Sequence, residues 1–317
     1  MTILVIKLGA LGDFILAEAA FKAIRTHHPR ERLILLTTPT FEKLAQKLGY
    51  FDSVFALPRF SFFQWKGWRK LLSWFRSLGV SRVYDLQMVN RTKIYYHAFK
   101  CVKKKPFEWV GHIKTSPYCL EDAYFKNHPS ERFHRLLEKV GIARLPDLDI
   151  TRLSEAIEVP SLEEPYVLVV PNASNAFGGA KKWSLEKYKT LLTWLTSKGY
   201  QAVIVGGFAD DHSTLSVNSN IHDLTGKTSF GQIIGLAQKA DFALGSDTGP
   251  IHMAAASLCP VFVLFSDKAL PAKQVGARGI LYHHKTVEDL AFLEPSEVIK
   301  DIESFIGKVK SLKRENS

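Results

Sequence analysis

The sequence of 317 residues is poor in cysteine, in long apolar runs and, over one stretch, in acidic side chains. Its three cysteines, Cys101, Cys119 and Cys259, show neither metal-ligand spacing nor obvious pairing, which argues against a disulfide framework. No apolar run approaches the roughly 20 residues that a membrane-spanning helix needs. Because the first residues also lack the basic start and cleavage site of a secretory signal, we expect a cytoplasmic protein.

Acidic residues are almost missing between Asp52 and Glu108, where Asp85 stands alone among many lysines and arginines. The net charge of the whole chain is +11, and this stretch places much of the positive charge in the first half. Such a field suits an anionic substrate, an anionic membrane surface or nucleic acid, and charge alone does not choose among them. Aromatic residues alternate with cations at helical spacing over 62–76. This amphipathic stripe either packs on its own domain or contacts a membrane interface or a lipid-linked anionic acceptor.

Short apolar strands alternate with helices in two successive cycles. Residues 3–6, 32–37 and 82–86 predict strands in the first cycle, and residues 166–170, 201–205, 240–244 and 261–265 predict strands in the second. This alternation is typical of α/β domains with a parallel sheet. We predict an N-terminal domain at 1–155, a linker at 156–165, a second domain at 166–294 and a C-terminal helix at 295–317 that could pack back on the N-terminal domain. Two such domains side by side leave a cleft at the carboxyl ends of their strands, where open sheets bind ligands.

The stretch from Ser246 to Ala256 is the most informative, because it joins a strand end to a helix start. Asp247, Thr248 and Gly249 precede Pro250, whose fixed φ suits the first helical turn. The free N–H groups of a helix start bind phosphate. A plain turn capped by Asp247 or Thr248 is the alternative. His252, three residues after Gly249, is either a ligand contact or a satisfied core histidine.

Two other turns carry polar groups. The loop 171–184 includes Ser174 and Lys181, which could bind phosphate, although a solvated loop with Trp183 anchoring a helix is also possible. The first turn, 7–13, is neither GxGxxG nor a P-loop, and its Asp13 is either a helix N-cap or a base for a substrate hydroxyl. Asp210 and Asp211 are more typical of exposed loop charges than of ribose contacts. No residues show metal-ligand spacing, and we expect neither metal nor cofactor.

Taken together, these residues resemble the ADP-heptose:lipopolysaccharide heptosyltransferases, glycosyltransferase family 9, over nearly the whole chain. Four places carry the resemblance. They are Lys7 to Asp13, Asp85-Leu86-Gln87 with Arg91-Thr92, the loop 171–183 with its Lys-x-Trp, and Asp247-Thr248-Gly249-x-x-His252.

The resemblance implies a GT-B architecture, two Rossmann-like domains facing each other across a cleft, and an inverting, metal-independent transfer. Asp13 would be the general base. Ser174, Lys181, Asp247, Thr248, Gly249 and His252 would bind the nucleotide-sugar, with Lys181 and the amides near Thr248 stabilising the diphosphate leaving group. The basic first domain, with Lys66, Arg69, Lys70 and Arg91, would bind an anionic glycolipid at the cytoplasmic face of the inner membrane.

The sequence does not decide the identities of the donor and the acceptor. The loop after Phe265, residues 266–271, departs from the Gly-Pro-Thr type usual in the family, and it lies near the donor sugar. The resemblance favours transfer of heptose from ADP-heptose to a lipopolysaccharide core or related envelope glycan, whereas this loop leaves open the same chemistry with another nucleotide-sugar or a protein acceptor. A non-catalytic glycan-binding protein of the same fold is a further alternative. A nucleic-acid partner rests on charge alone and is not expected.

Overall fold

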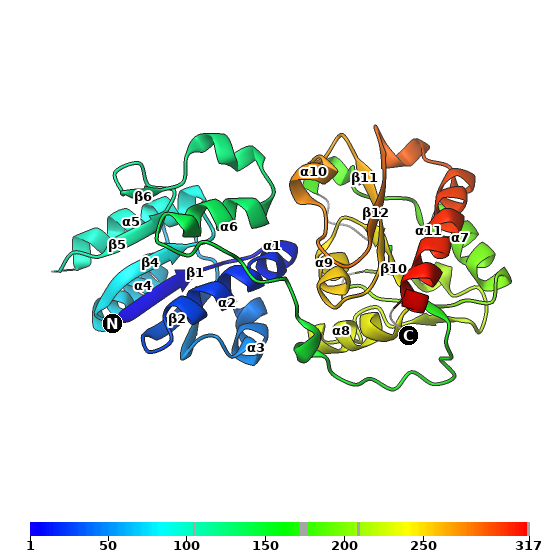
Figure 1. The fold of residues 1–317 in the computed structure, drawn as a ribbon, viewed down its shortest axis with the longest axis horizontal. Helices are drawn as coiled ribbons and strands as arrows, with labels where there is room; N and C mark the ends of the chain where they lie inside the picture. The colour runs from blue at the N-terminus through cyan, green and yellow to red at the C-terminus, as the bar shows by residue number, and fades with distance from the viewer. Residues whose placement is uncertain (104, 172–175, 208–209, 316–317) are drawn as a thin grey trace. The chain divides into compact units, whose positions relative to one another are not determined.

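The computed structural model describes residues 1–103, 105–171, 176–207 and 210–315. The chain divides into two compact units, Met1–Asp147 and Leu148–Ser317. In Figure 1 the first runs from blue to green and the second from green to red. Among the described residues, each unit contains one six-stranded sheet in which every paired strand is parallel. The predicted α/β class is therefore confirmed.

The first unit has the sheet order β3-β2-β1-β4-β5-β6. Its elements, in chain order, are β1 (Thr2–Ile6), α1 (Leu11–Leu16), α2 (Glu18–His27), β2 (Arg32–Thr37), α3 (Pro39–Leu48), β3 (Ser53–Ala56), α4 (Trp65–Ser77), β4 (Val80–Asp85), α5 (Asn90–Val102), β5 (Glu108–Gly111), β6 (Tyr118–Cys119), the 3-10 turn η1 (Asp122–Lys126) and α6 (Pro129–Glu138).

Helices α4 and α5 pack on the apolar face that alternate strand residues present. Leu4 and Ile6 of β1 share one buried cluster with Phe75 of α4 and Phe99 of α5. The rings of Phe75 and Phe99 stack with centroids 3.8 Å apart. Because successive strand residues point to opposite faces, this packing fixes which side of the sheet the two helices cover.

The second unit repeats the pattern with the order β12-β11-β10-β7-β8-β9. Its elements are η2 (Thr151–Leu153), β7 (Tyr166–Val170), η3 (Ala176–Gly179), α7 (Leu185–Ser197), β8 (Gln201–Ile204), η4 (Ser213–Leu215), β9 (Ile221–Asp223), α8 (Phe230–Lys239), β10 (Phe242–Ser246), α9 (Gly249–Ala256), β11 (Val261–Ser266), α10 (Ala272–Val275), β12 (Tyr282–Val287), η5 (Leu290–Phe292) and α11 (Pro295–Glu315).

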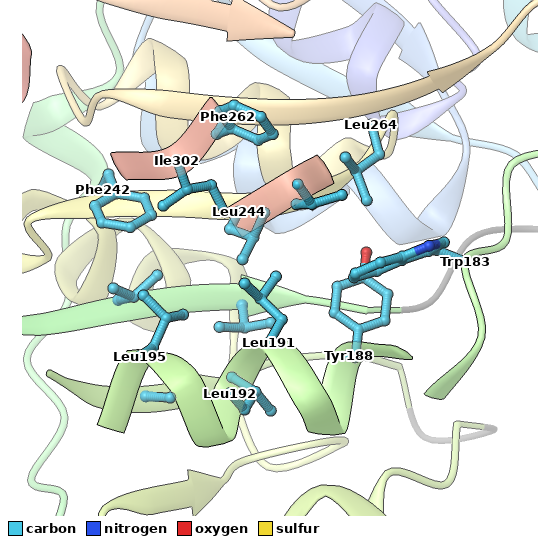
Figure 2. Packing of buried hydrophobic residues seen from close by; sticks show 14 of the residues in the cluster. Trp183, Tyr188, Leu191, Leu192, Leu195, Phe242, Leu244, Phe262, Leu264 and Ile302 are labelled. Atoms are coloured by element: carbon cyan, nitrogen blue, oxygen red, sulfur yellow. The ribbon is translucent and has the colours of Figure 1, made fainter. Parts of the chain in front are cut away.

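One core joins the two longest helices of this unit to its central strands. Figure 2 shows Leu191 and Leu195 of α7 pointing toward Leu244 and Phe242 of β10. The apolar stripe of α11 is buried in the same cluster, whose α11 members are Val298, Ile302, Phe305 and Val309. The apolar face of α11 is therefore covered by β10 and β11 of its own unit. That this helix also packs back on the N-terminal domain stays a prediction.

The boundary between the units falls before the end of the predicted first domain. Residues 148–155, which the sequence assigned to that domain, form backbone hydrogen bonds with the second unit. The Ile150 N–H donates to the Ala256 carbonyl at 3.0 Å, and the Glu155 N–H donates to the Gly231 carbonyl at 2.9 Å. These bonds tie the segment to α8 and α9, so it forms part of the second unit.

Candidate functional site

Each sheet has one place where the strand order reverses, and several of the predicted site residues follow the strands there. In the first unit the reversal lies between β1 and β4, and in the second between β7 and β10. Lys7 follows β1, and the loop that follows β7 carries Lys181 while Asp247 follows β10. The loops at the carboxyl ends of such strands diverge to opposite faces and leave a crevice for ligands. The topology thus gives a physical reason to look for a site in each unit.

The helix α9 begins without a side-chain cap. Thr248 occupies the N-cap position with extended backbone, but its hydroxyl makes no capping hydrogen bond. The Thr248 Oγ1 atom is buried and has no partner among the described residues. The alternative of a turn capped by Asp247 or Thr248 is therefore wrong. The first N–H groups of α9 keep their capacity to bind an anion.

Asp247 forms the centre of a buried charge cluster. Its Oδ2 atom pairs with the Lys181 ammonium, and its Oδ1 atom accepts from the His252 Nε2 at 3.2 Å. The Lys181 ammonium also donates to the Asp247 main-chain carbonyl at 3.4 Å. The three side chains lie within a buried or nearly buried environment, where charged hydrogen bonds are stronger than in water. The lysine from the loop after β7 and the histidine of α9 are thereby held on one carboxylate.

The cluster keeps Asp247 ionised. Burial raises the pKa of its carboxyl, but the hydrogen bond from His252 and the charge of Lys181 outweigh that effect and hold the pKa below its usual value. The remaining ring nitrogen of His252, Nδ1, is buried and unpaired in the described part of the chain. Because a buried polar atom without a partner is costly, such an atom at a helix start points to a ligand contact.

The loop before α7 divides into two roles. Trp183 is buried, donates its Nε1–H to the Leu293 carbonyl at 2.9 Å, and lies edge-on to Tyr188 with centroids 4.8 Å apart. This confirms that the tryptophan anchors the helix to the core. Ser174 lies outside the described residues. Of the two phosphate contacts predicted in this loop, the structure therefore describes Lys181, which lies close to the start of α9.

Asp13 lies in the first turn of α1 and is not its N-cap. Ala10 occupies that position, so the interpretation of Asp13 as a cap is wrong. Gly9 sets the entry to this helix with a φ of 115°, and a Cβ there would lie 2.6 Å from the Phe41 ring. The carboxylate of Asp13 is half-buried and does not serve the helix backbone, which leaves it available for other chemistry.

Two cations of the first unit, the buried Lys7 and the half-buried Arg132, interact electrostatically with Asp13. Lys7 is almost fully buried, and its ammonium donates to the Leu86 carbonyl at 3.3 Å. Burial lowers the pKa of Lys7, and the negative charge of Asp13 opposes that shift. Burial also lowers the pKa of Arg132 on α6, where Asp13 again opposes it. Asp13 thus lies close enough to both cations for its charge to favour their protonated forms.

The four predicted acceptor residues lie in different settings. Lys66, Arg69 and Lys70 are exposed on α4, and Lys66 and Lys70 line a hollow of about 560 Å³ together with Arg59. Arg91 of α5 turns inward, because its guanidinium donates to the Phe60 carbonyl at 2.9 Å. The first three are free to meet an anion, whereas Arg91 supports the chain between β3 and α4.

The geometry agrees with comparisons to known proteins. The family model described as glycosyltransferase family 9 (heptosyltransferase) matches residues 67–271. The chain belongs to glycosyltransferase family 9. A curated relative, lipopolysaccharide heptosyltransferase 3 of Escherichia coli K12, is 26% identical over 189 residues, which cover 55% of this chain and 51% of that protein. The chain therefore matches about half the length of that relative.

Two solved structures share the fold over nearly the whole chain. E. coli ADP-heptose LPS heptosyltransferase II superposes with a TM-score of 0.75 at 18% identity, covering 98% of this chain and 100% of that one. An E. coli heptosyltransferase solved with ADP gives a TM-score of 0.73 at 15% identity, covering 96% and 99%. The expected GT-B fold is confirmed by this likeness.

Sequence reasoning for this family 9 protein left two residues without a role. Lys7 carried a signal, because a lysine directly after a buried apolar strand is unusual. Arg132 carried no such signal, since a lone arginine in an amphipathic helix is ordinary, and its relation to Asp13 depends on how α6 packs.

The acids of the loop after β8 contact their own loop. Asp210 accepts from the Gly207 N–H at 2.7 Å, and Asp211 accepts from the Ser213 N–H at 3.1 Å, as loop charges do.

The part of the chain that the structure describes contains no group of three or more histidine, cysteine or acidic residues that could hold a metal ion. Across the same residues, no helix is both long and apolar enough to cross a bilayer.

Proposed function

We propose that this family 9 glycosyltransferase transfers heptose from ADP-heptose to a hydroxyl of an anionic envelope glycolipid, such as a lipopolysaccharide core. The transfer inverts the anomeric centre, needs no metal, and takes place at the cytoplasmic face of the inner membrane. The cluster of Lys181, Asp247 and His252 at the uncapped start of α9 carries this proposal. The structure solved with ADP and the heptosyltransferase relatives support the choice of donor.

The donor diphosphate would lie against the start of α9. The N–H groups near Thr248 and Gly249 supply fixed positive dipoles, and Lys181 supplies a full charge. When the bond from the anomeric carbon to the diphosphate oxygen breaks, negative charge grows on the leaving oxygen. A lysine already held in place by Asp247 stabilises that charge without reorganising. This replaces the role that a divalent metal plays in other sugar transfers.

Asp13 would act as the general base. It takes the proton of the acceptor hydroxyl as the oxygen attacks the anomeric carbon, and attack opposite the leaving diphosphate inverts that centre. The carboxylate of Asp13 is half-buried and does not cap the helix, so it is available to a substrate hydroxyl. The exposed cations Lys66, Arg69 and Lys70 would bind the acidic groups of the acceptor.

The test of the donor site compares two adjacent lysines. Lys181→Met removes the charge beside the α9 start, whereas Lys182→Met removes an exposed one. We expect Lys181→Met to weaken ADP binding at least about tenfold, because a charge-assisted phosphate contact is lost, and Lys182→Met to change it less than about twofold. Isothermal titration with ADP measures both. Equal losses in the two variants would contradict the assignment, and tighter binding of UDP than of ADP would contradict the choice of donor.

A further inference from the structure

The aromatic residues between β3 and the first turns of α4 fall into two groups. Phe60 and Trp68 point into the unit, where their rings lie edge-on with centroids 5.3 Å apart and Trp68 also contacts Tyr95. Phe62, Phe63 and Trp65 lie on the surface, with 63%, 89% and 60% of their areas exposed. Packing within the first unit therefore accounts for only part of the aromatic stripe at 62–76.

The exposed group is held in place. The Trp68 indole donates to the Phe62 carbonyl at 2.9 Å, and Arg91 donates to the Phe60 carbonyl at the same distance. The Ser61 N–H donates to the Gln64 side chain at 3.0 Å. These bonds fix the backbone on both sides of Phe62 and Phe63. The exposed side chains of Phe62 and Phe63 thus extend from a backbone that these hydrogen bonds hold in place.

The apolar surface continues onto α5. Phe62 and Ile94 line one hollow of about 150 Å³ with Trp68 and Arg91, and Ile94 is itself exposed. Single exposed apolar residues are normal on a protein surface, but a contiguous group of aromatic and aliphatic side chains marks an interaction site.

Exposed cations lie beside these aromatic residues in the chain, and exposed acids do not. Lys66, Arg69 and Lys70 are exposed, and within the described residues none of them forms an ion pair with a carboxylate. The Arg69 guanidinium lies 5.1 Å from the centre of the Trp65 ring. The single acid between residues 53 and 107, Asp85, is buried. Tryptophan and phenylalanine beside unpaired lysine and arginine are the composition that binds the interface of an anionic bilayer.

We propose that this aromatic–basic face, formed by Phe62, Phe63, Trp65, Lys66 and Arg69, seats the protein on a bilayer rich in anionic phospholipid. Phe63 and Trp65 enter the boundary between headgroups and acyl chains, and Lys66 and Arg69 meet the lipid phosphates. The charge complementarity favours lipid over a second copy of this chain, which would bring the same positive charges together. The inference deepens the proposed function and rests on its placement of the reaction at the membrane, where Lys66 and Arg69 are also proposed to bind the acceptor; the membrane contact itself requires no nucleotide.

The experiment measures binding of the full chain to vesicles by sedimentation, with no nucleotide present. One vesicle is phosphatidylethanolamine with phosphatidylglycerol in a ratio of about three to one, and the other is pure phosphatidylcholine. We expect at least about tenfold tighter binding to the anionic vesicles, weakening as salt is raised. The Phe63→Ser/Trp65→Ser variant keeps the charge and should bind at least about fivefold more weakly. Lys66→Glu/Arg69→Glu should lose the preference for anionic lipid.

Matched controls come from the second unit. Phe292 is 79% exposed, so Phe292→Ser removes a comparable aromatic surface, and Lys308→Glu/Lys310→Glu reverses two exposed charges on α11. Both should bind vesicles like the unaltered chain, and all variants should show the same thermal unfolding. Unchanged binding by Phe63→Ser/Trp65→Ser would overturn the proposal. Full displacement by inorganic phosphate at equal ionic strength, or loss of self-association instead of vesicle binding, would also overturn it. ADP titration of the same variants tests the proposed function separately.

Discussion

At the scale of single residues, each unit has one carboxylate that is central to the proposed site, Asp247 in the second unit and Asp13 in the first. Asp247 contacts a lysine of the loop after β7 and a histidine of α9, and both favour its ionised form. Asp13 differs, since it does not cap its helix and lies near the buried Lys7 and the half-buried Arg132. The first arrangement is suited to steady binding of a charged group. The second leaves the Asp13 carboxylate without a capping role, as the proposed role of base requires.

Asp13→Asn tests the proposed base, and Glu42→Gln is its matched control. Glu42 is also the acid in the first turn of a helix, α3, which likewise lacks a side-chain cap. Each change should cost about 0.3–1 kcal/mol of stability through the helix dipole. Only Asp13→Asn should abolish transfer, lowering kcat at least about 100-fold while ADP binding stays the same. Rates with donor and acceptor, together with titrations of ADP, separate the two variants; equal rates would remove Asp13 from catalysis.

At the scale of elements, the paired strands β7 and β10 position the two loops that we propose bind the donor. They lie side by side at the strand-order reversal, so the loop with Lys181 and the start of α9 emerge at the same edge. The approach of the two strands leaves no room for a side chain at Gly245, where a Cβ would lie 2.3 Å from the Val170 carbonyl oxygen. The distance between these two loops thus depends on Gly245, which has no side chain to contact a ligand itself.

Two glycine-to-alanine changes should act in opposite directions. Gly245→Ala forces β7 and β10 apart and should lower the free energy of unfolding by about 1–3 kcal/mol, with weaker ADP binding. Gly307 lies inside α11, and a Cβ there meets no atom within 4 Å. Gly307→Ala should therefore raise the free energy of unfolding by about 0.5–1 kcal/mol, since alanine loses less entropy in a helix. Urea denaturation measures both; stabilisation by Gly245→Ala would contradict the packing argument.

At the scale of the whole molecule, the two units have separate cores and separate tasks in the proposed reaction. The second unit contains the predicted phosphate contacts that the structure describes, and α11 completes its core. The first unit carries the proposed base and the aromatic–basic face. The segment 148–155 belongs to the second unit through its bonds to Gly231 and Ala256. Nucleotide binding and membrane binding are therefore expected to be separable by cutting the chain at the structural boundary.

A fragment of residues 148–317 should fold and bind ADP within about threefold of the full chain. A fragment starting at residue 166 lacks the partners of Gly231 and Ala256 and exposes the surface that Ile150 and Leu153 cover. Its free energy of unfolding should be lower by about 2 kcal/mol or more, because at least two backbone hydrogen bonds and buried apolar area are lost. Chemical denaturation and ADP titration of both fragments test this. Equal stability would place residues 148–165 outside the folded unit.

The sequence by itself determined the α/β class, the two-domain repeat and the family. Strand and helix periodicity is local, and motifs such as Asp247-Thr248-Gly249-x-x-His252 are contiguous, so both can be read without a structure. Only the tertiary structure joined Lys181 to Asp247 across 66 residues, placed Arg132 near Asp13, buried the stripe of α11 in its own unit and divided the aromatic stripe into a packed and an exposed part. These relations depend on strand order and helix packing, which bring distant residues together and which local pattern does not encode.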